Sequence, residues 1–474
     1  MAMSEVALRV LRDVFGHEGF RAGQREIITA LLAGRDVLGV LPTGTGKSLC
    51  YQLPACLSRS LTVVISPLIA LMRDQVLSLR RRGVACAALH AGLESAEREQ
   101  VLAALEQRRL RVLYLAPERL EGASFAALLA RVGVGLVAVD EAHCISAWGH
   151  DFRPSYRRLG AALDGIGARV RLALTATATP AVRREIASAL RLRDPLEHVG
   201  SFYRQNLHLS VRPIAPAHRL DEVRAAIAGA GAAIVYAATR MQAEQTARAL
   251  GALCYHAGMS PEARSRAQDA FVGGQAPTVV ATNAFGLGVD KPDVRAVVHL
   301  QMPASLEAYV QEVGRGGRDG QPCRCVLLQA PNDEQVHRAL IERSFPDDAM
   351  ARRLVAAAEQ GRLRVTRIED LPGLLPRERS VAERSLEALI ATGVLRVEPF
   401  AWVRPAPDGH VALDDLRRHR LQRTQLLRRM TQFSALRGAC RHARISAYFG
   451  QRLPAASCGR CDGCDRSASQ QAAC

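Results

Sequence analysis

Lysine is nearly absent from this chain of 474 residues. Lysine and arginine together number 63, but only Lys47 and Lys291 are lysines. Arginine cannot replace lysine where a compact ammonium charge must fit a tight anion-binding loop, because the guanidinium group is wide and planar. A lysine kept in such an arginine-rich chain therefore indicates a position where the shape of the cation matters.

Long apolar runs are also absent. No stretch approaches the roughly 20 apolar residues that a membrane-spanning helix requires, and the first residues, MAMSEVALRVLRD, do not have the pattern of a signal peptide. We therefore expect a soluble, cytoplasmic protein without a membrane partner. In that compartment the 12 cysteines are expected to stay reduced unless they bind a metal.

The composition is typical of a globular protein with several domains. Hydrophobic residues make up 48% of the chain and charged residues 23%, and a chain of this length normally divides into more than one domain. The formal net charge of +17 predicts a polyanionic partner, most often nucleic acid. A genomic preference for arginine is the alternative explanation of this charge.

The stretch VLPTGTGKSLCYQLP, residues 40–54, has the features of a phosphate-binding loop. It follows an apolar strand pattern, passes through glycines and enters an amphipathic helix at Lys47 and Ser48. Glycines let backbone N–H groups curl around an anion, while the lysine can reach the β- and γ-phosphates and the serine can hold Mg²⁺. Leu41 stands where the general pattern has glycine, which indicates a subtype of the loop. The predicted nucleotide-binding residues of the loop are Thr43, Gly44, Thr45, Gly46, Lys47 and Ser48.

Two further segments of the first half complete this site. Gln24 begins a predicted helix, and its side-chain amide suits the N6/N7 edge of adenine. The run GLVAVDEAHCISAWGHDFRPSY, residues 135–156, ends an apolar strand in Asp140 and Glu141. The first carboxylate can hold Mg²⁺, and the second can orient and deprotonate the attacking water. Strands and helices alternate throughout, which predicts an α/β lobe with a parallel sheet.

A second α/β pattern begins after SFYRQNLH, residues 201–208. It includes the strand pattern AAIVYAATR, which ends at Arg240, but it has no phosphate loop of its own. Near its end, YVQEVGRGGRDG contains Arg315 and Arg318, whose spacing of three places them on one face of a helix. Both side chains are expected to point into the cleft between the lobes, where an arginine finger can reach the γ-phosphate.

Four cysteines near the C-terminus have the spacing of metal ligands. Cys458, Cys461 and Cys464 can surround one ion, and Cys440 can complete a tetrahedral set for Zn²⁺. Such a site supplies folding energy to a small segment. His442 is an alternative fourth ligand, and reduced thiols in a flexible tail are the alternative without metal.

With these motifs, the chain resembles the RecQ family of DNA helicases in superfamily two. The resemblance covers residues 15–320 and 440–464, through FRAGQ, LPTGTGKSLCYQLP, DEAHCISAWGHDFRPSY, LTATAT, AFGLGVDKPDVR and QEVGRGGRDG. It implies two RecA-like lobes and the ligands ATP, Mg²⁺ and Zn²⁺, with Cys440 favoured over His442 as the fourth zinc ligand. The implied partners are single-stranded and duplex DNA.

The resemblance also implies roles for individual residues. Arg21 joins Gln24 in recognising adenine, although His17 stands where the family has an aromatic residue. Arg318 is the implied finger with Arg315 assisting it. Gln311 is expected to help position the attacking water. The residues expected to contact DNA or couple that contact to hydrolysis are Trp148, Phe152, Arg153 and Arg240.

The region from residue 347 to about 415 departs from the family, which has only a short helical link there. RSVAERSLEALIATGVLRV predicts a helix and a strand, and FAWVRPAPDGHVAL predicts a hairpin. These elements predict a winged helix, while a spacer or protein-docking module stays open as the alternative. Two arginine-rich helices are expected to follow and to contact DNA phosphates. The predicted domains of this α/β chain are RecA-like lobe 1 (1–205), RecA-like lobe 2 (206–345), a winged-helix-like insert (346–415) and a helical hairpin with the zinc-binding module (416–468).

The combined prediction is a nucleoid-associated, ATP-dependent DNA helicase of recombination and repair. We expect it to move 3′ to 5′ along single-stranded DNA and to unwind duplex or branched DNA. An RNA-remodelling ATPase is one alternative, because the sequence Asp-Glu-Ala-His also occurs in RNA helicases. A DNA-binding scaffold with an inactive ATPase is another, although no catalytic side chain is missing.

Overall fold

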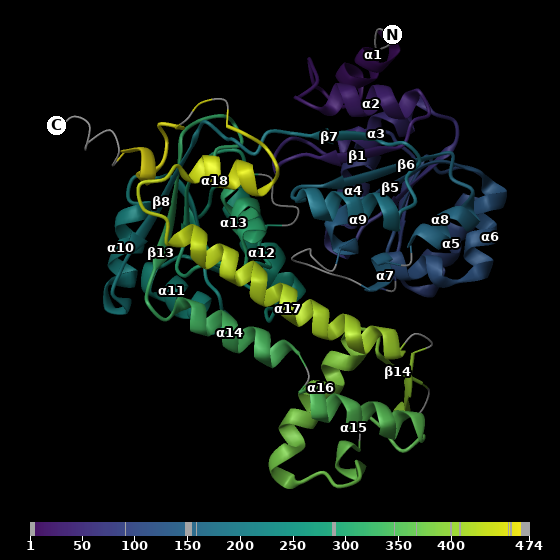
Figure 1. Ribbon diagram of the computed structural model, residues 1–474. Helices are drawn as coiled ribbons and strands as arrows, with labels where there is room; N and C mark the ends of the chain where they lie inside the picture. Colours follow the sequence, from purple (N-terminus) through teal and green to yellow (C-terminus); the bar gives the residue numbers. More distant parts are fainter. Residues whose placement is uncertain are drawn as a thin grey trace.

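The structure is a computed structural model that describes residues 5–90, 92–146, 154–157, 159–286, 291–345, 347–365, 367–398, 401–406, 409–453, 455 and 457–465. Figure 1 shows two α/β lobes side by side and a smaller body below them. A long helix runs from the smaller body across the second lobe. None of the described helices has the length and apolar character needed to cross a membrane.

Lobe 1 alternates strands with helices. Its elements are α1 (Glu5–Asp13), α2 (Gln24–Leu32), β1 (Val37–Val40), α3 (Leu49–Leu57), β2 (Leu61–Ile65), α4 (Ile69–Arg81), β3 (Cys86–Leu89), α5 (Ser95–Glu106), β4 (Val112–Leu115), α6 (Ala123–Val132), β5 (Val134–Val139), α7 (Pro154–Arg157), α8 (Leu159–Ile166), β6 (Val170–Thr175), α9 (Pro180–Ala189) and β7 (Leu196–Val199). The strands form a parallel sheet in the order β3-β4-β2-β5-β6-β1-β7. Helices α1 to α4 pack on one face, and α5, α6, α8 and α9 pack on the other. The central strands are therefore apolar on both faces, as parallel sheets require.

Lobe 2 repeats this plan. Its elements are β8 (Leu207–Pro213), α10 (Arg219–Ile227), β9 (Ala232–Tyr236), α11 (Arg240–Leu250), β10 (Leu253–Tyr255), α12 (Pro261–Val272), β11 (Thr278–Ala281), β12 (Val294–His299), α13 (Leu306–Val313), β13 (Cys323–Gln329) and α14 (Asp333–Ser344). The sheet is parallel, with the order β10-β11-β9-β12-β13-β8. The prediction of two parallel-sheet lobes is thus confirmed.

The smaller body, residues 347–406, has a core of its own and is called the insert below. It contains α15 (Asp348–Glu359), α16 (Arg379–Ala391), β14 (Leu395–Val397) and β15 (Val403–Pro405). The two strands pair antiparallel, and Arg364 forms a further antiparallel bridge with Trp402. The guanidinium of Arg364 lies 4.0 Å from the centre of the Trp402 ring. The expected helix and the strand after it are present as α16 and β14. The hairpin expected within residues 400–413 is wrong, because β15 pairs with β14 and a helix begins at Gly409. The assignment as a winged helix stays a prediction.

Helix α17 (Gly409–Ser434) connects the insert to the lobes. Its 26 residues correspond to a length of about 39 Å. Leu416 belongs to the core of the insert, whereas Leu427 and Phe433 belong to the core shared with the lobes. The predicted domain boundary between residues 415 and 416 falls inside this helix. Helix α18 (Arg441–Tyr448) follows, so both expected arginine-rich helices are confirmed.

Candidate nucleotide and zinc sites

The phosphate-binding loop connects the carboxyl end of β1 to the amino end of α3. Ser48 is the N-cap, and the helix begins at Leu49. Gly44 and Gly46 have φ values of 87° and 75°, which side chains rarely allow. A Cβ at Gly46 would lie 2.9 Å from Gln24 Nε2. The loop therefore has the open, backbone-lined shape of a phosphate cradle.

Gln24 and Arg21 hold this loop from α2 and the segment before it. Gln24 Nε2 donates to Thr45 O at 2.8 Å and to Gly46 O at 3.0 Å, and its Oε1 accepts from Arg21 N at 2.8 Å. Arg21 Nη1 donates to Gly44 O at 2.6 Å. The structure thus brings both residues to the nucleotide loop. Their contact with adenine stays a prediction.

Asp140 and Glu141 follow the carboxyl end of β5. Asp140 is buried, and its Oδ1 accepts a hydrogen bond of 2.9 Å from Glu141 N. The pKa of Asp140 is raised to about 6, because burial and the Glu141 carboxylate raise it more than the Lys47 ammonium lowers it. The lysine of the phosphate loop and the carboxylate predicted to hold Mg²⁺ therefore act within one site.

Glu141 is joined to the next strand through His143. Glu141 has a left-handed backbone with φ of 48°, a conformation that is sparsely populated by residues other than glycine. Its Oε2 lies 3.3 Å from His143 Nδ1, which lies 3.0 Å from Thr175 Oγ1 at the end of β6. Burial acts to lower the pKa of His143, but Cys144 and Glu141 outweigh it and raise the pKa well above its usual value. The imidazolium therefore connects the Glu141 carboxylate to the loop after β6.

Arg318 of lobe 2 reaches the phosphate loop of lobe 1. A Cβ on Gly44 would lie 3.1 Å from Arg318 Cγ and 3.5 Å from its Nε. The turn that carries it is held by Arg204 Nη2 and Asn206 Nδ2, which donate to Gly317 O at 2.8 and 2.7 Å. These two positioning residues lie in SFYRQNLH, which the sequence marks only as a junction. Their polar side chains beside a lobe boundary are the signal that could have identified them.

Arg315 does not point into the cleft, contrary to expectation. Helix α13 ends at Val313, so both arginines follow the helix and the argument from helical spacing does not apply. Arg315 is 5% exposed, its Nη1 donates to Gly286 O, and it lies beside the phenol of Tyr236. It is therefore part of the interior of lobe 2. Gln311 lies in the last turn of α13, and its role stays a prediction.

The residues expected to contact DNA are only partly described. Arg240 is exposed at the start of α11, and a Cβ on Gly258 would lie 3.0 Å from its Nη1. Trp148, Phe152 and Arg153 lie outside the described residues. The DNA-contacting roles of all four residues stay predictions.

Cys440, Cys458, Cys461 and Cys464 come together as the sequence predicts. Their four sulfur atoms lie within 4.8 Å of one another, with 3.7 Å between Cys458 and Cys464 and 3.5 Å between Cys461 and Cys464. Tetrahedral Zn²⁺ with bonds of about 2.3 Å requires sulfur separations of roughly 3.8 Å, so the residues fit this ion. Arg441 N and Ala443 N donate to the sulfurs of Cys461 and Cys440, each at 3.4 Å. Such donors orient and stabilise metal-bound thiolates.

His442 is not part of this cluster. Its Nε2 donates to Leu207 O at 3.0 Å, and the side chain is buried against lobe 2. Cys440 is therefore the fourth member of the set, as the resemblance implies.

Three known domain families match the chain in the order of its modules. The DEAD/DEAH box helicase family matches residues 21–186, and the helicase conserved C-terminal domain matches residues 218–320. The RecQ zinc-binding family matches residues 410–465, which contain all four cysteines.

Curated relatives extend these matches. An ATP-dependent DNA helicase RecQ from Synechocystis is 38% identical over 98% of this chain and 99% of its own length. A probable ATP-dependent DNA helicase RecS from Bacillus subtilis is 35% identical over 94% of this chain and 88% of its own. The RecQ helicase of Pasteurella multocida is 42% identical over 72% of this chain, which spans 55% of that longer protein.

Solved structures share the fold. The helicase Lhr of Mycobacterium smegmatis, bound to single-stranded DNA and AMP-PNP, has a TM-score of 0.54 at 21% identity over 86% of this chain and 61% of its own. The DUF1998 helicase MrfA, bound to DNA and AMPPNP, has a TM-score of 0.58 at 19% identity over 86% and 62%. With the full-length relatives and the three matching domains, the chain belongs to the RecQ family and is an ATP-dependent DNA helicase that uses ATP with Mg²⁺ and carries a zinc site.

Proposed function

We propose that this helicase hydrolyses ATP between its two lobes and uses their closure to move 3′ to 5′ along single-stranded DNA. The observation that carries the proposal is the position of Arg318 against Gly44, across the lobe interface. An arginine supplied by the second lobe stabilises the transferring phosphoryl group only when the lobes meet. Hydrolysis therefore depends on closure, and closure can be linked to movement on DNA.

Each residue of the nucleotide site has a distinct task in this proposal. Lys47 binds the β- and γ-phosphates, while Ser48 and Asp140 are placed to hold the metal ion. Mg²⁺, when bound, neutralises the negative charge of the phosphate oxygens. Glu141 orients the attacking water and accepts its proton at a carboxylate oxygen, and Gln311 helps to position that water.

The ion pair between Glu141 and His143 suits this task. The His143 ring, with its Nδ1 3.3 Å from Glu141 Oε2, favours the ionised carboxylate because an adjacent cation stabilises an anion. An ionised carboxylate is an acceptor only, so it can take a hydrogen bond from water and fix its direction.

Recognition of adenine by Gln24 requires a change of partners. In the structure its amide holds two carbonyls of the phosphate loop. Reading the N6/N7 edge of adenine requires the amide to turn toward the base, while Arg21 keeps its bond to Gly44 O. Nucleotide binding and loop conformation are therefore coupled through α2.

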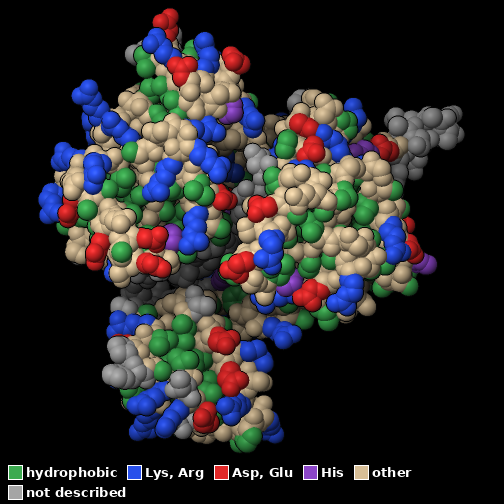
Figure 2. All heavy atoms as spheres, turned by 180° about the vertical axis from the view of Figure 1, so that it is seen from behind, with side chains coloured by type: hydrophobic (Ala, Val, Ile, Leu, Met, Phe, Trp, Pro, Cys, Tyr) green, Lys and Arg blue, Asp and Glu red, His purple; other side chains and the backbone are tan. Residues whose placement is uncertain are grey.

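DNA is the nucleic acid along which we propose that the protein moves, since the relatives that match nearly the whole chain are named DNA helicases. The fold alone does not decide this, because Mss116 bound to single-stranded RNA has a TM-score of 0.58 at 18% identity. Figure 2 shows many Lys and Arg side chains over lobe 1 and the insert, as phosphate binding requires. We propose that Arg240, Trp148, Phe152 and Arg153 lie along the bound DNA strand. We also propose that the protein associates with the nucleoid. The expected role in recombination and repair fits the family.

A strand-separation assay tests the proposal. Duplexes carrying a 3′ tail, a 5′ tail or no tail are compared as DNA and as RNA, with Lys47→Ala as the control. We expect separation of the 3′-tailed DNA duplex only, and complete loss of separation in the variant.

The other outcomes are equally informative. Separation from a 5′ tail would overturn the direction, and separation of RNA would favour an RNA-remodelling ATPase. DNA-stimulated hydrolysis without separation would identify a translocase that does not unwind.

A further inference from the structure

The zinc-binding module, residues 440–465, contacts both lobes. On lobe 2, His442 Nε2 donates to Leu207 O at 3.0 Å, and Asp462 Oδ2 accepts from Val211 N at 3.1 Å. On the side of lobe 1, Gln451 accepts from Phe202 N and donates to Gly200 O, both at 3.0 Å. The module therefore spans residues 200–206, the junction that connects the two lobes. Any movement of one lobe relative to the other must involve this junction.

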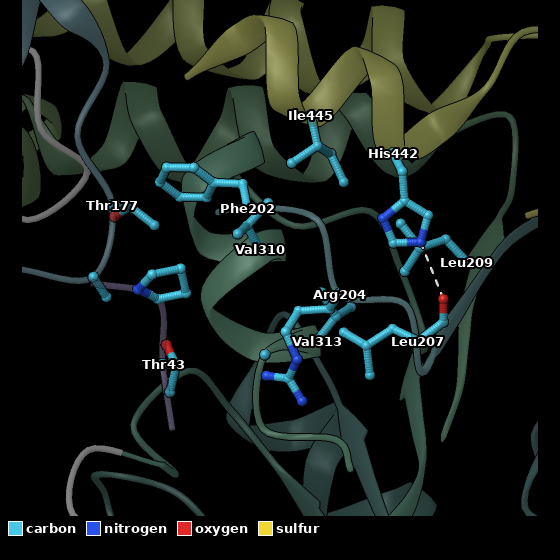
Figure 3. Close-up of a pocket in the computed structure, with 13 residues that line it drawn as sticks. Thr43, Thr177, Phe202, Arg204, Leu207, Leu209, Val310, Val313, His442 and Ile445 are labelled. Atoms are coloured by element: carbon cyan, nitrogen blue, oxygen red, sulfur yellow. Dashed lines mark hydrogen bonds between the residues drawn. The ribbon is translucent and has the colours of Figure 1, made fainter. Parts of the chain in front are cut away.

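A pair of stacked rings forms the centre of this contact. The rings of Phe202 in the junction and Phe449 in the module lie 4.0 Å apart at an angle of 8°. Figure 3 shows Phe202 beside a small cavity, with Ile445 and His442 of the module on one side and Thr43 and Thr177 of lobe 1 on another. The phosphate loop, the loop after β6, the helix before Arg318 and the zinc-binding module thus meet around one cavity.

Arg183 of α9 ties the module to lobe 1. Its Nη1 donates to Phe449 O at 3.1 Å and to Ala178 O at 3.2 Å, and its Nε lies 2.7 Å from Glu197 Oε1. Its side chain is only 11% exposed. Because a guanidinium presents several donors in a fixed plane, one side chain can hold these three partners together.

The Ala178 carbonyl belongs to the loop that reaches the catalytic carboxylate. In this loop, Thr175 Oγ1 donates to Thr177 O at 3.1 Å. The same hydroxyl oxygen lies 3.0 Å from His143 Nδ1, so the ring nitrogen must donate to it. His143 in turn contacts Glu141. Hydrogen bonds, a short loop and the ion pair of His143 with Glu141 therefore connect Arg183 to the residue that orients the attacking water.

We propose that Arg183 is a positioning residue through which the zinc-binding module controls the alignment of Glu141 during lobe closure. The inference rests on the proposed function. When lobe 2 closes on lobe 1, the module moves with the junction, and Arg183 transmits this movement to the Ala178 carbonyl. Without Arg183 the zinc-binding module and lobe 1 stay folded, but the alignment of Glu141 no longer follows lobe closure driven by DNA.

The test compares Arg183→Gln with Arg184→Gln in the full chain. Arg184 is the exposed neighbour on the same helix, so its variant removes the same charge. The measurement is the ratio of ATP hydrolysis with saturating single-stranded DNA to hydrolysis without DNA. We expect this ratio to fall about tenfold in Arg183→Gln, within the usual range of coupling between sites. The KM for ATP and the Kd for DNA should be retained, and Arg184→Gln should match the wild-type ratio.

Two further variants separate positioning from folding. Arg183→Lys should restore only part of the ratio, because one ammonium cannot reproduce the planar set of bonds. Gln451→Leu removes the separate hydrogen bonds of the module to Phe202 N and Gly200 O, and it should lower the ratio while zinc content stays unchanged. In the double variant Arg183→Gln/Gln451→Leu the ratio should fall no further than in the more affected single variant, because the mechanism needs both contacts and the loss of either one interrupts it.

An unchanged ratio in Arg183→Gln would overturn the inference. A fall in both hydrolysis rates together with the melting temperature, at constant ratio, would also overturn it by showing a purely structural role. Absence of any DNA stimulation in the wild-type chain would instead contradict the proposed function.

Discussion

Arg315 and Arg318 are three residues apart but belong to different parts of the molecule. Arg318 crosses the lobe interface to Gly44, whereas Arg315 lies inside lobe 2 and donates to Gly286 O. The glycine-rich turn after α13 causes this divergence, because successive residues of a turn do not share a face. Arg318 therefore lies where the proposed finger must act, whereas Arg315 holds the interior of lobe 2.

Alanine variants should separate these two tasks. Arg318→Ala should lower kcat about a thousandfold, as for other arginine fingers, while ATP binding and the melting temperature are retained. Arg315→Ala should destabilise lobe 2 by about 1–3 kcal/mol, the cost of leaving a buried carbonyl without its donor. Hydrolysis assays and thermal unfolding check both outcomes. Normal turnover in Arg318→Ala would show that Arg318 takes no part in hydrolysis.

Single residues differ in how far the sequence predicts them. Lys47, Ser48 and Asp140 follow from motifs whose residues act within a few positions of one another. Arg183 does not, because its bonds reach Ala178, five residues away, and Phe449, 266 residues away. No local pattern encodes the second contact, which exists only after the chain has folded.

At the scale of elements, the strands were the most predictable feature and the end of the insert the least. The buried runs before Pro42, Ser66 and Asp140 form β1, β2 and β5. FAWVRPAPDGHVAL predicts a hairpin, but β15 ends at Pro405 and α17 already begins at Gly409. Local sequence does not reveal this helix start, because a tertiary contact supports it: Leu416 of α17 packs in the core of the insert.

Helix α17 carries a buried histidine at the joint between the insert and lobe 2. The ring of His419 lies edge-on to Phe345 at 5.4 Å, just after α14. Burial lowers the pKa of His419 to about 4, and Arg423 on the same helix contributes to this shift. The folded protein therefore holds this ring neutral at a pH where the unfolded chain takes up a proton.

Acid should consequently weaken this joint. The pKa of His419 in the folded protein lies below the unfolded value of about 6.5. Its contribution to the stability of the folded protein is therefore complete above about pH 6.5 and is lost as the pH falls toward 4. At pH 5 the loss amounts to about 2 kcal/mol. The loss of unfolding free energy between pH 7 and pH 5, measured by thermal unfolding, should be smaller for His419→Leu than for the wild type. The exposed His218→Leu serves as the control, and equal differences in both variants would contradict the assignment.

At the scale of the whole molecule, the zinc-binding module has a position that its cysteine spacing does not reveal. The spacing of Cys458, Cys461 and Cys464 predicts a local metal site. The structure adds that the module bonds to strands of lobe 2 and, through Gln451 and Arg183, to lobe 1. The module that holds the metal site is therefore in contact with both lobes.

Loss of the metal should accordingly affect more than the module. Cys461→Ser should lower the zinc content from about one equivalent to less than half, because structural zinc supplies the folding free energy of such segments. DNA-stimulated hydrolysis should fall with it, although the cysteine is not part of the nucleotide site. Cys254→Ser, which changes a cysteine of β10 outside the cluster, should keep both properties. Elemental analysis and hydrolysis assays on the same preparations provide the measurement. A folded Cys461→Ser chain without zinc but with full stimulation would show that the module does not act on the cleft.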